Sequence, residues 1–293
     1  MQILPGESLA IFTEESIHIL RGTSSADFQL IKHSDEMGAM ANTVQNMPTA
    51  IFCDRRGITT LDQSDRYGDF VNNTLSHHFD RLYREVKSDP LWSSVNRSRS
   101  QYRIMNAYGR GIYLTFNNRA LAGAMPINLG LTSPITAVGN RRNNVQTDEM
   151  FFGTADGWVY RMDYGVTFDG ERIPAFLKFP FCHMKSPRQK KRFRLAVLDM
   201  EGDPFTSLQA RGEIEHGHKH HADNRIVNSQ IESGAQSFYN GFSYDLPPVL
   251  ESEVYLEGTG TDLAMVFRSD SQANYHHTIH SMIIHYNPRG LKR

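Results

Sequence analysis

The chain has 293 residues, and its 31 Lys and Arg against 32 Asp and Glu leave a formal net charge of -1. Because one hydrophobic core seldom grows beyond roughly 250 to 300 residues, two domains are expected. The balanced charge excludes a bulk attraction to nucleic acid or anionic membranes. The longest apolar stretches, such as residues 282–284, are far shorter than the roughly 20 residues of a membrane span, and residues 1–5 lack a signal-peptide pattern. We therefore expect neither a membrane span nor secretion.

Four pairs of β-rich runs recur along the first half of the chain, each joined by a short polar turn. They are residues 10–12 with 17–20, 50–52 with 57–61, 102–105 with 111–116, and 150–152 with 157–162. Gly, Asn and Asp in the turns tolerate the positive φ of tight hairpins. The pairs start 40, 52 and 48 residues apart, close to the ~40 to 50 residue period of a β-propeller blade. An irregular β-sandwich meander would give a similar pattern and stays open.

One helix is predicted between the second and third pairs, near residues 71–87. Its apolar residues are spaced by 4, 4, 3 and 4 positions and so lie on one face; they are Val71, Leu75, Phe79, Leu82 and Val86. A proline at position 90 is expected to end this segment.

The sequence pattern changes after Asp163. A turn-rich segment at residues 164–170 is followed by β-rich runs that lie farther apart in the sequence. Extended runs follow at residues 173–181, 193–200, 254–257, 263–268 and 278–286. Such strands with long polar loops are typical of a β-sandwich. The sequence therefore predicts a mainly β protein, with propeller-like blades in residues 1–165 and a β-sandwich domain in residues 166–293.

The densest cluster of potential metal ligands lies between Glu215 and Asp223. Imidazoles and carboxylates can bind zinc or nickel, and an extended strand would place His216, His218 and His220 on one side. A His-rich loop without metal is the more ordinary interpretation, and a metal store or sensor is the alternative. A second group is expected to hold surface histidines: His276, His277, His280 and His285.

Catalytic motifs are missing from the sequence. There is no Gly-x-Ser-x-Gly elbow, phosphate loop or His-Glu-x-x-His. Cys53 and Cys182 match no zinc or disulfide spacing and are expected to be reduced structural thiols. The acidic residues nominate no pair of carboxylates for glycoside hydrolysis. We therefore expect no enzymatic activity and no cofactor.

Residues 185–194 form the one dense run of positive charge. Such a run can neutralise several phosphates, although Phe193 is its single aromatic residue and single-strand binders use more. The alternative is that Arg192 and Arg194 alternate with Phe193 and Leu195 on a half-buried strand, with the charges in water or against a neighbouring subunit. The candidate DNA-channel or interface residues are Lys185, Arg188, Lys190, Lys191 and Arg192.

Several segments together are similar to one known family. The most distinctive are residues 152–163, Gly165 with 167–170, and 186–187 with 191–194; looser matches are residues 6–13, 19–22, 56–58, 99–103 and 285–290. On these segments the chain resembles the tail nozzle proteins of short-tailed bacteriophages, the group called tail tubular protein B or packaged-DNA stabilisation protein. The matches cover most of the chain, and each is loose.

The resemblance implies a β-propeller attached to a β-sandwich platform, with six copies forming a ring around the DNA exit channel. Such a ring retains the packaged genome and conducts it during ejection. Its expected place is the virion tail, after assembly in the host cytoplasm, and it implies no catalytic residues. The expected partners are copies of the chain itself, the portal and adaptor, tail fibre or needle proteins, and packaged double-stranded DNA in transient contact. The chain opens at what looks like the middle of the propeller, so a second chain is expected to complete it.

A second interpretation is a carbohydrate-binding or glycan-cleaving propeller for host attachment. Trp158, Tyr160, Tyr108 and Tyr113 could stack on sugar faces. Aromatic residues in paired strands more often pack between sheets.

Overall fold

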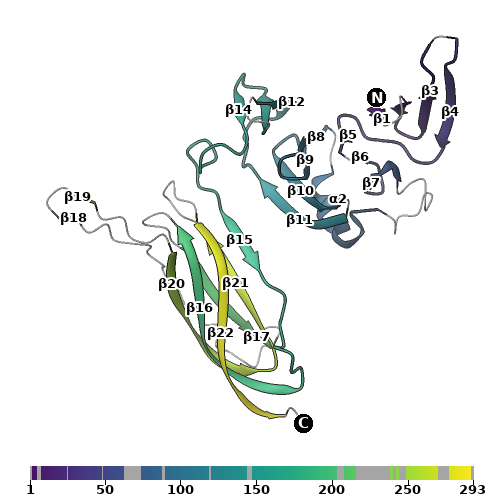
Figure 1. The fold of residues 1–293 in the computed structure, drawn as a ribbon. Helices are drawn as coiled ribbons and strands as arrows, with labels where there is room; N and C mark the ends of the chain where they lie inside the picture. The colour runs from purple at the N-terminus through teal and green to yellow at the C-terminus, as the bar shows by residue number, and fades with distance from the viewer. Residues whose placement is uncertain are drawn as a thin grey trace. The chain divides into compact units, whose positions relative to one another are not determined.

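The computed structural model is mainly β, as the sequence predicts, and its strands form several small antiparallel sheets (Figure 1). It divides into two compact units, Met1–Tyr164 and Gly165–Arg293, beside the boundary expected near residue 165. Within the described part of the chain, no helix has the length and hydropathy to cross a membrane. The residues that the structure describes are 2–4, 8–24, 26–47, 49–62, 74–87, 90–118, 120–143, 147–202, 208–215, 238–239, 242–243, 249–269 and 277–291.

Unit 1 contains four antiparallel sheets that follow one another along the chain, and consecutive strands pair within each. The predicted hairpins are confirmed as β2–β3, β6–β7, β9–β10 and β13–β14. The first sheet holds β1 (Gln2–Leu4), β2 (Ser8–Phe12), β3 (Ile17–Arg21) and β4 (Gln29–Ser34), and the second β5 (Gln45–Asn46), β6 (Ala50–Cys53) and β7 (Ile58–Thr60). The third holds β8 (Leu91–Asn96), β9 (Gln101–Asn106), β10 (Arg110–Asn117) and β11 (Ala120–Asn128), and the fourth β12 (Ile135–Arg142), β13 (Asp148–Thr154) and β14 (Val159–Arg161).

The four sheets pack face to face in chain order, with a separate hydrophobic cluster at each junction. Phe52 and Ile17 are buried between the first and second sheets, where Phe12 packs on Phe52 with ring centroids 5.0 Å apart. Ile51 and Ile104 belong to the cluster between the second and third sheets. A third cluster joins the third sheet to the fourth, and the first strands of successive sheets also touch, β1 with β5, β5 with β8 and β8 with β12. The two middle sheets are therefore covered on both faces.

The helix between the second and third sheets is shorter than predicted. A 3-10 turn, η2 (His77–Phe79), leads into α2 (Asp80–Val86), and Val71 lies outside the described residues. Phe79 has φ -134°, which is not helical, so the α-helix begins only after it. Its apolar face packs into the cluster between the second and third sheets, as the spacing predicts.

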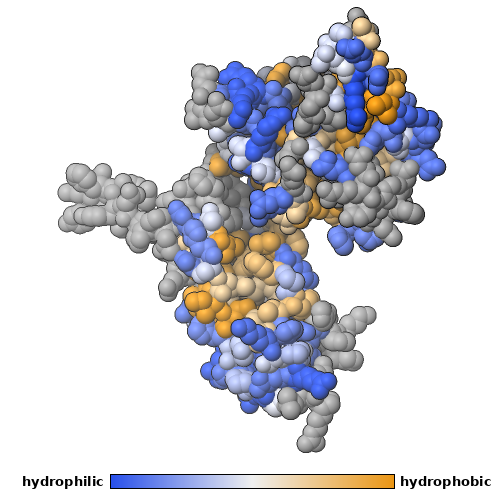
Figure 2. Space-filling model, turned by 45° about the vertical axis from the view of Figure 1, so that its right-hand side comes forward, coloured by the Kyte–Doolittle hydropathy of each residue, from blue (hydrophilic) through white to orange (hydrophobic). Residues whose placement is uncertain are grey.

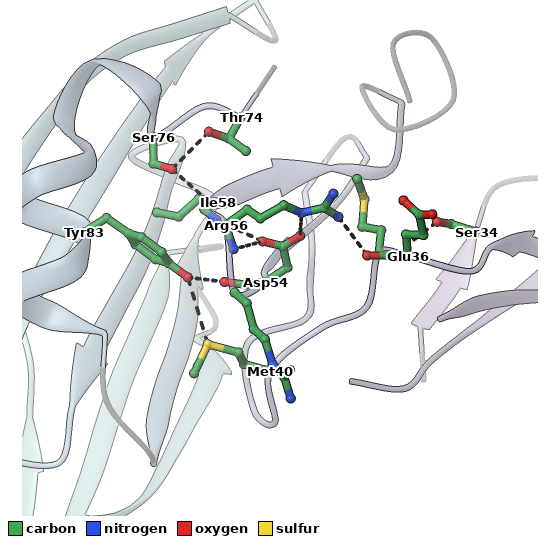
Figure 3. A network of polar contacts seen from close by, with 12 residues as sticks. Ser34, Glu36, Met40, Asp54, Arg56, Ile58, Thr74, Ser76 and Tyr83 are labelled. Carbon is green, nitrogen blue, oxygen red and sulfur yellow. Dashed lines mark hydrogen bonds and ion pairs between the residues drawn. The ribbon is translucent and has the colours of Figure 1, made fainter. Parts of the chain in front are cut away.

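Polar contacts fix this helix to the turn between β6 and β7 (Figure 3). One Asp54 carboxylate oxygen accepts the Gly57 N–H at 2.9 Å, and the other pairs with Arg56 Nε at 3.0 Å. Arg56 also donates to the Glu36 carbonyl at 3.1 Å, in the segment between β4 and β5. The buried Tyr83 hydroxyl of α2 donates to the Asp54 carbonyl at 2.6 Å. The turn thus anchors both the helix and the connection between the first two sheets.

The described residues of unit 2 form two three-stranded antiparallel sheets and a short hairpin. One sheet has the order β15 (Ala175–Lys178), β21 (Leu263–Ser269), β17 (Gln209–Ile214), and the other β20 (Val249–Gly260), β16 (Gln189–Gly202), β22 (His277–Leu291); the hairpin pairs β18 (Phe238–Tyr239) with β19 (Phe242–Ser243). Phe193 and Leu198 of one sheet share a single cluster with Met265 and Phe267 of the other. This two-layer packing agrees with the β-sandwich expected for this part of the chain.

Candidate nucleic-acid interface

The basic run lies partly in the loop before β16 and partly on the first residues of β16. This strand is the centre of its sheet, between β20 and β22. Side chains of this strand point alternately to its two faces. Phe193 therefore points into the core, where 1% of its surface is exposed, while Arg192 and Arg194 are exposed. This is the half-buried strand that the alternative interpretation of the run predicted. The exposed cations of the run are Lys185, Arg188, Lys190, Arg192 and Arg194.

Lys191 was wrongly chosen as a candidate DNA contact, because its side chain is fully buried. Its ammonium donates to three carbonyls, those of Ser186 at 2.7 Å, Gln189 at 3.0 Å and Thr261 at 2.9 Å. Loss of hydration lowers the pKa of Lys191, and the charge of Asp262 opposes that shift. Three acceptors match the three donors of an ammonium group. Lys191 therefore fastens the basic loop to the turn between β20 and β21 and is not available to a partner.

Arg289 of β22 is also exposed and lies beside the basic run, although it was not among the candidates from the sequence. It lines a surface depression of about 530 Å³ with Arg192, above Gly258 and Thr259 of β20. The antiparallel register, which pairs Arg192 with Asn287, brings the two arginines together. No local sequence signal marks Arg289, because only strand pairing places it beside a run so far away in the chain.

The resulting surface can attract phosphate but has little means of reading bases. Alternate residues of a strand recur about every 6.8 Å, so Arg192 and its neighbours on the outer face are spaced charges and not one concentrated site. Arginine binds phosphate through paired N–H donors, and exposed charges act over roughly a Debye length of 8 to 10 Å. Glu257 in the same depression adds one opposing charge. Figure 2 shows hydrophilic residues gathered at the end of unit 2 near the C-terminus.

The structure does not test the main metal-ligand candidates. His216, His218, His220 and His276 lie outside the described residues. Of the second histidine group, His280 meets Glu201 at 3.0 Å on the surface, and His285 is exposed. Within the ranges given above, no group of three His, Cys, Asp or Glu residues is placed to hold a metal ion.

The four aromatic residues considered for sugar stacking divide into two pairs. Trp158 is 67% exposed and Tyr108 is 56% exposed. Tyr113 is buried beneath the Arg103 guanidinium, 4.2 Å from its ring centroid, and Tyr160 stacks on Phe152 at 5.1 Å. Only the first pair could meet a sugar.

The two cysteines lie in different surroundings, and Cys53 is not placed as a nucleophile. Cys53 is fully buried, and this burial raises its pKa to about 12, so the reactive thiolate is absent near neutral pH. Its sulfur lies 3.4 Å from the hydroxyl oxygen of Tyr102. Cys182 is exposed, and both thiols are free.

Comparison with known proteins does not assign the chain to a family. No protein-family model matches the sequence, and no curated protein matches it. The resemblance to tail nozzle proteins therefore stays a prediction that rests on the short segments described above.

Proposed function

We propose that this chain is a structural subunit of a short-tailed bacteriophage tail, in which several copies form a ring around the DNA exit channel. The observation that carries the proposal is the series of four meander sheets in unit 1. Each sheet packs on the next, and the first strands touch in chain order. Successive blades of a β-propeller pack in this way. Unit 1 would then be an arc of blades and unit 2 the platform.

The packing of both units suits a protein that works by holding its shape. Backbone pairing occupies the strands, and close-packed clusters resist compression. The sequence carries no catalytic motif, and the buried Cys53 is unsuited to nucleophilic chemistry. Within a tail, the ring would retain the packaged genome and conduct it during ejection, with contacts to portal, adaptor and fibre or needle proteins.

The exposed basic surface of unit 2 would meet the DNA that passes through the ring. Lys190, Arg192 and Arg289 would contact phosphates, whose spacing is the same in every sequence. Electrostatic contacts of this kind are weakened by salt and allow a protein to slide along DNA. Conduction needs such reversible contact, since a tight site would arrest the genome.

DNA binding measured against salt concentration tests this role. The triple variant Lys190→Ala, Arg192→Ala and Arg289→Ala should reduce the slope of log affinity against log salt by about 0.9 for each phosphate that the variant no longer neutralises. A control with the same charge change is Arg55→Ala, Arg81→Ala and Arg84→Ala, whose side chains are 68%, 95% and 75% exposed in unit 1. Equal slopes for the two triples, or no salt dependence in the unaltered chain, would count against the DNA-channel surface.

A glycan-binding propeller is the second candidate, because Trp158 and Tyr108 expose large aromatic surfaces. Glycan-array binding by the full chain, lost on Trp158→Ala, would favour this function over the tail subunit. A tail subunit of the kind proposed is expected to show no such binding.

A further inference from the structure

The junction between the third and fourth sheets holds two buried polar atoms without a hydrogen-bond partner among the described residues. They are Oγ of Ser94 and Nη1 of Arg103. Ser94 is 1% exposed, and Arg103 is 0% exposed. Buried polar groups of folded proteins are nearly always hydrogen-bonded, so an unpaired group indicates a bound water molecule or ion. Two such groups at one place indicate a shared occupant.

The strand registers place both groups on the same face of the third sheet. Ser94 of β8 pairs with Arg103 of β9, which in turn pairs with Tyr113 of β10. Tyr113 belongs to the hydrophobic cluster that joins the third sheet to the fourth. Trp92, two positions before Ser94, donates to the Ile135 carbonyl of the fourth sheet at 3.2 Å. Because directly paired residues share a face and alternate residues of a strand do too, Ser94 and Arg103 both face the fourth sheet.

Protein contacts occupy the rest of the Arg103 guanidinium. Its Nε and Nη2 donate to Gln101 Oε1 at 3.1 Å and 2.6 Å, and Nη2 also donates to Asp163 Oδ2 at 2.7 Å. The guanidinium carbon lies 4.2 Å from the centroid of the Tyr113 ring, which covers one side of the group. Nη1 keeps two N–H donors, and the Ser94 hydroxyl can supply a third. The free valences of this buried place are therefore donors.

The charges beside these donors favour a negative occupant. Arg103 and Arg99 share the carboxylate of Asp163, whose Oδ2 lies 2.7 Å from the first guanidinium and 3.7 Å from the second. The same oxygen accepts a hydrogen bond from Asn96 at 3.4 Å. Burial raises the pKa of Tyr113 to about 12 against the opposing charge of Arg103, so the phenol is neutral near pH 7. Two cations therefore share one carboxylate, and the neighbouring tyrosine adds no negative charge.

We propose that Ser94 and Arg103 bind one small monovalent anion, of the size and charge of chloride, between the third and fourth sheets of unit 1. Such an ion accepts hydrogen bonds from both residues, and its attraction to a buried guanidinium is strong where the dielectric constant is low. A water molecule fits less well, because it brings two further donors that need acceptors of their own. A sulfate or phosphate group would carry a second charge and several oxygens into a place that offers two donor groups.

The anion site goes beyond the proposed function and does not rest on it. It depends only on the packing of the third sheet against the fourth, and neither DNA binding nor ring formation enters the argument. An ion that binds the folded state alone stabilises that state in proportion to the logarithm of its concentration, once this exceeds the dissociation constant. The site therefore makes the stability of unit 1 depend on which anion is present.

Thermal unfolding of the full chain in sodium chloride and in sodium gluconate, at equal ionic strength, tests the proposal. Gluconate has the same charge as chloride and is too large to enter a buried place between two sheets. We expect unit 1 to melt at a higher temperature in chloride, by about 3 to 6 °C for each ten-fold rise in concentration above the dissociation constant. Equal melting temperatures in the two salts at every concentration would overturn the proposal.

Two adjacent serines of β8 separate ion binding from a general effect of salt. Ser94→Ala should weaken chloride binding at least about ten-fold, because a hydrogen bond to a charged group is lost, and should change the melting temperature in gluconate little. Ser93→Ala is the matched control, since Ser93 is also buried but pairs with Ile104 on the other face and donates to the Asn42 carbonyl at 2.6 Å. It should lower the melting temperature in both salts and keep the gain from chloride. A gain that survives Ser94→Ala, or that both variants lose equally, would overturn the proposal.

Bromide locates the ion directly. Crystals of the full chain grown in gluconate and soaked in sodium bromide should show one anomalous peak in contact with Ser94 Oγ and Arg103 Nη1. The peak should be absent from crystals of the Ser94→Ala variant or much weaker there. Density of a water molecule at this place without an anomalous signal, or no density at all, would reject the anion.

Discussion

The two units bury their apolar side chains in different ways. Unit 2 has one cluster that is shared by both of its sheets, so its core is complete once the two sheets meet. Unit 1 has three clusters, each at a junction between consecutive sheets. A series of junctions has ends, and an end sheet can keep an apolar face free. Among the described residues, unit 2 thus has one core shared by its two sheets, whereas the core of unit 1 is divided among the junctions of successive sheets.

Among the described residues, each unit also buries one cation, and the two cations are satisfied differently. In unit 1, the fully buried Arg103 pairs with Asp163 at 2.7 Å. In unit 2, Lys191 donates only to carbonyls in the contacts described above. Removing the acidic partner of Arg103 would leave an uncompensated charge, whereas replacing Lys191 removes the charge itself. Removing Asp163 should therefore lower the free energy of unfolding more than replacing Lys191.

The largest expected effect comes from the closed core of unit 2. Phe193→Ala should lower the free energy of unfolding of this unit by about 4 kcal/mol, because a fully buried aromatic ring leaves a cavity. Calorimetry should show the transition of unit 2 moving down while that of unit 1 stays. A single transition that shifts as a whole would contradict separate cores.

The buried ion pair of unit 1 should give the next effect. Asp163→Asn should destabilise unit 1 by about 2 kcal/mol, less than for a fully buried pair because the Asp163 side chain is 26% exposed. Asparagine tolerates the positive φ of 56° at this position, so backbone strain does not contribute. Urea unfolding would measure the change, and Asp156→Asn on the neighbouring turn is the control. Equal free energies of unfolding for the Asp163→Asn variant and the unaltered chain would mean that the ion pair contributes nothing to stability.

Lys191 should matter less for stability and not at all for DNA. Lys191→Met should cost about 1 kcal/mol, since three carbonyls lose a donor but a buried charge is also removed. The salt slope of DNA binding should stay unchanged, in contrast to Lys190→Ala. A reduced slope for Lys191→Met alone would show that the buried ammonium contributes to the candidate interface.

The smallest effect is a pH dependence in unit 2. The hydrogen bond from Lys178, at 2.6 Å, and the contact with Arg211 lower the pKa of Glu213 below its usual 4.5. A lowered folded-state pKa contributes stability above pH 4.5, and this is lost as the pH falls through the lowered value. The Glu213→Gln variant should therefore be less stable than the unaltered chain at pH 7. Its free energy of unfolding should also fall less when the pH is lowered. Unfolding of both forms at pH 7 and pH 3 measures this, and parallel losses would contradict it.

Local patterns predicted much of the fold. The turn with Gly157, at φ 91°, and that with Gly109, at φ 74°, need residues that tolerate positive φ, which is why the hairpins could be recognised. Alternation correctly placed Phe193 inside and Arg192 outside. The same rule places Lys191 inside, yet the density of charge made it look like a surface residue. Its three carbonyl partners come from a loop and a distant turn that sequence spacing does not reveal.

Features that depend on register could not be predicted. Arg289 reaches Arg192 only through the pairing of β16 with β22. Hydrophobic periodicity predicted a longer helix than α2, because it does not sense the non-helical backbone at Phe79. Long-range pairing, and not local preference, decides each of these points.

Electron cryo-microscopy of the tails of the native particle, with this chain located by a tag of defined density, tests the central claim most directly. The account predicts several copies arranged as a hollow ring, with unit 1 in a continuous series of blades and the basic end of unit 2 lining the channel. A chain absent from the tail, or present as single copies away from the channel, would contradict it.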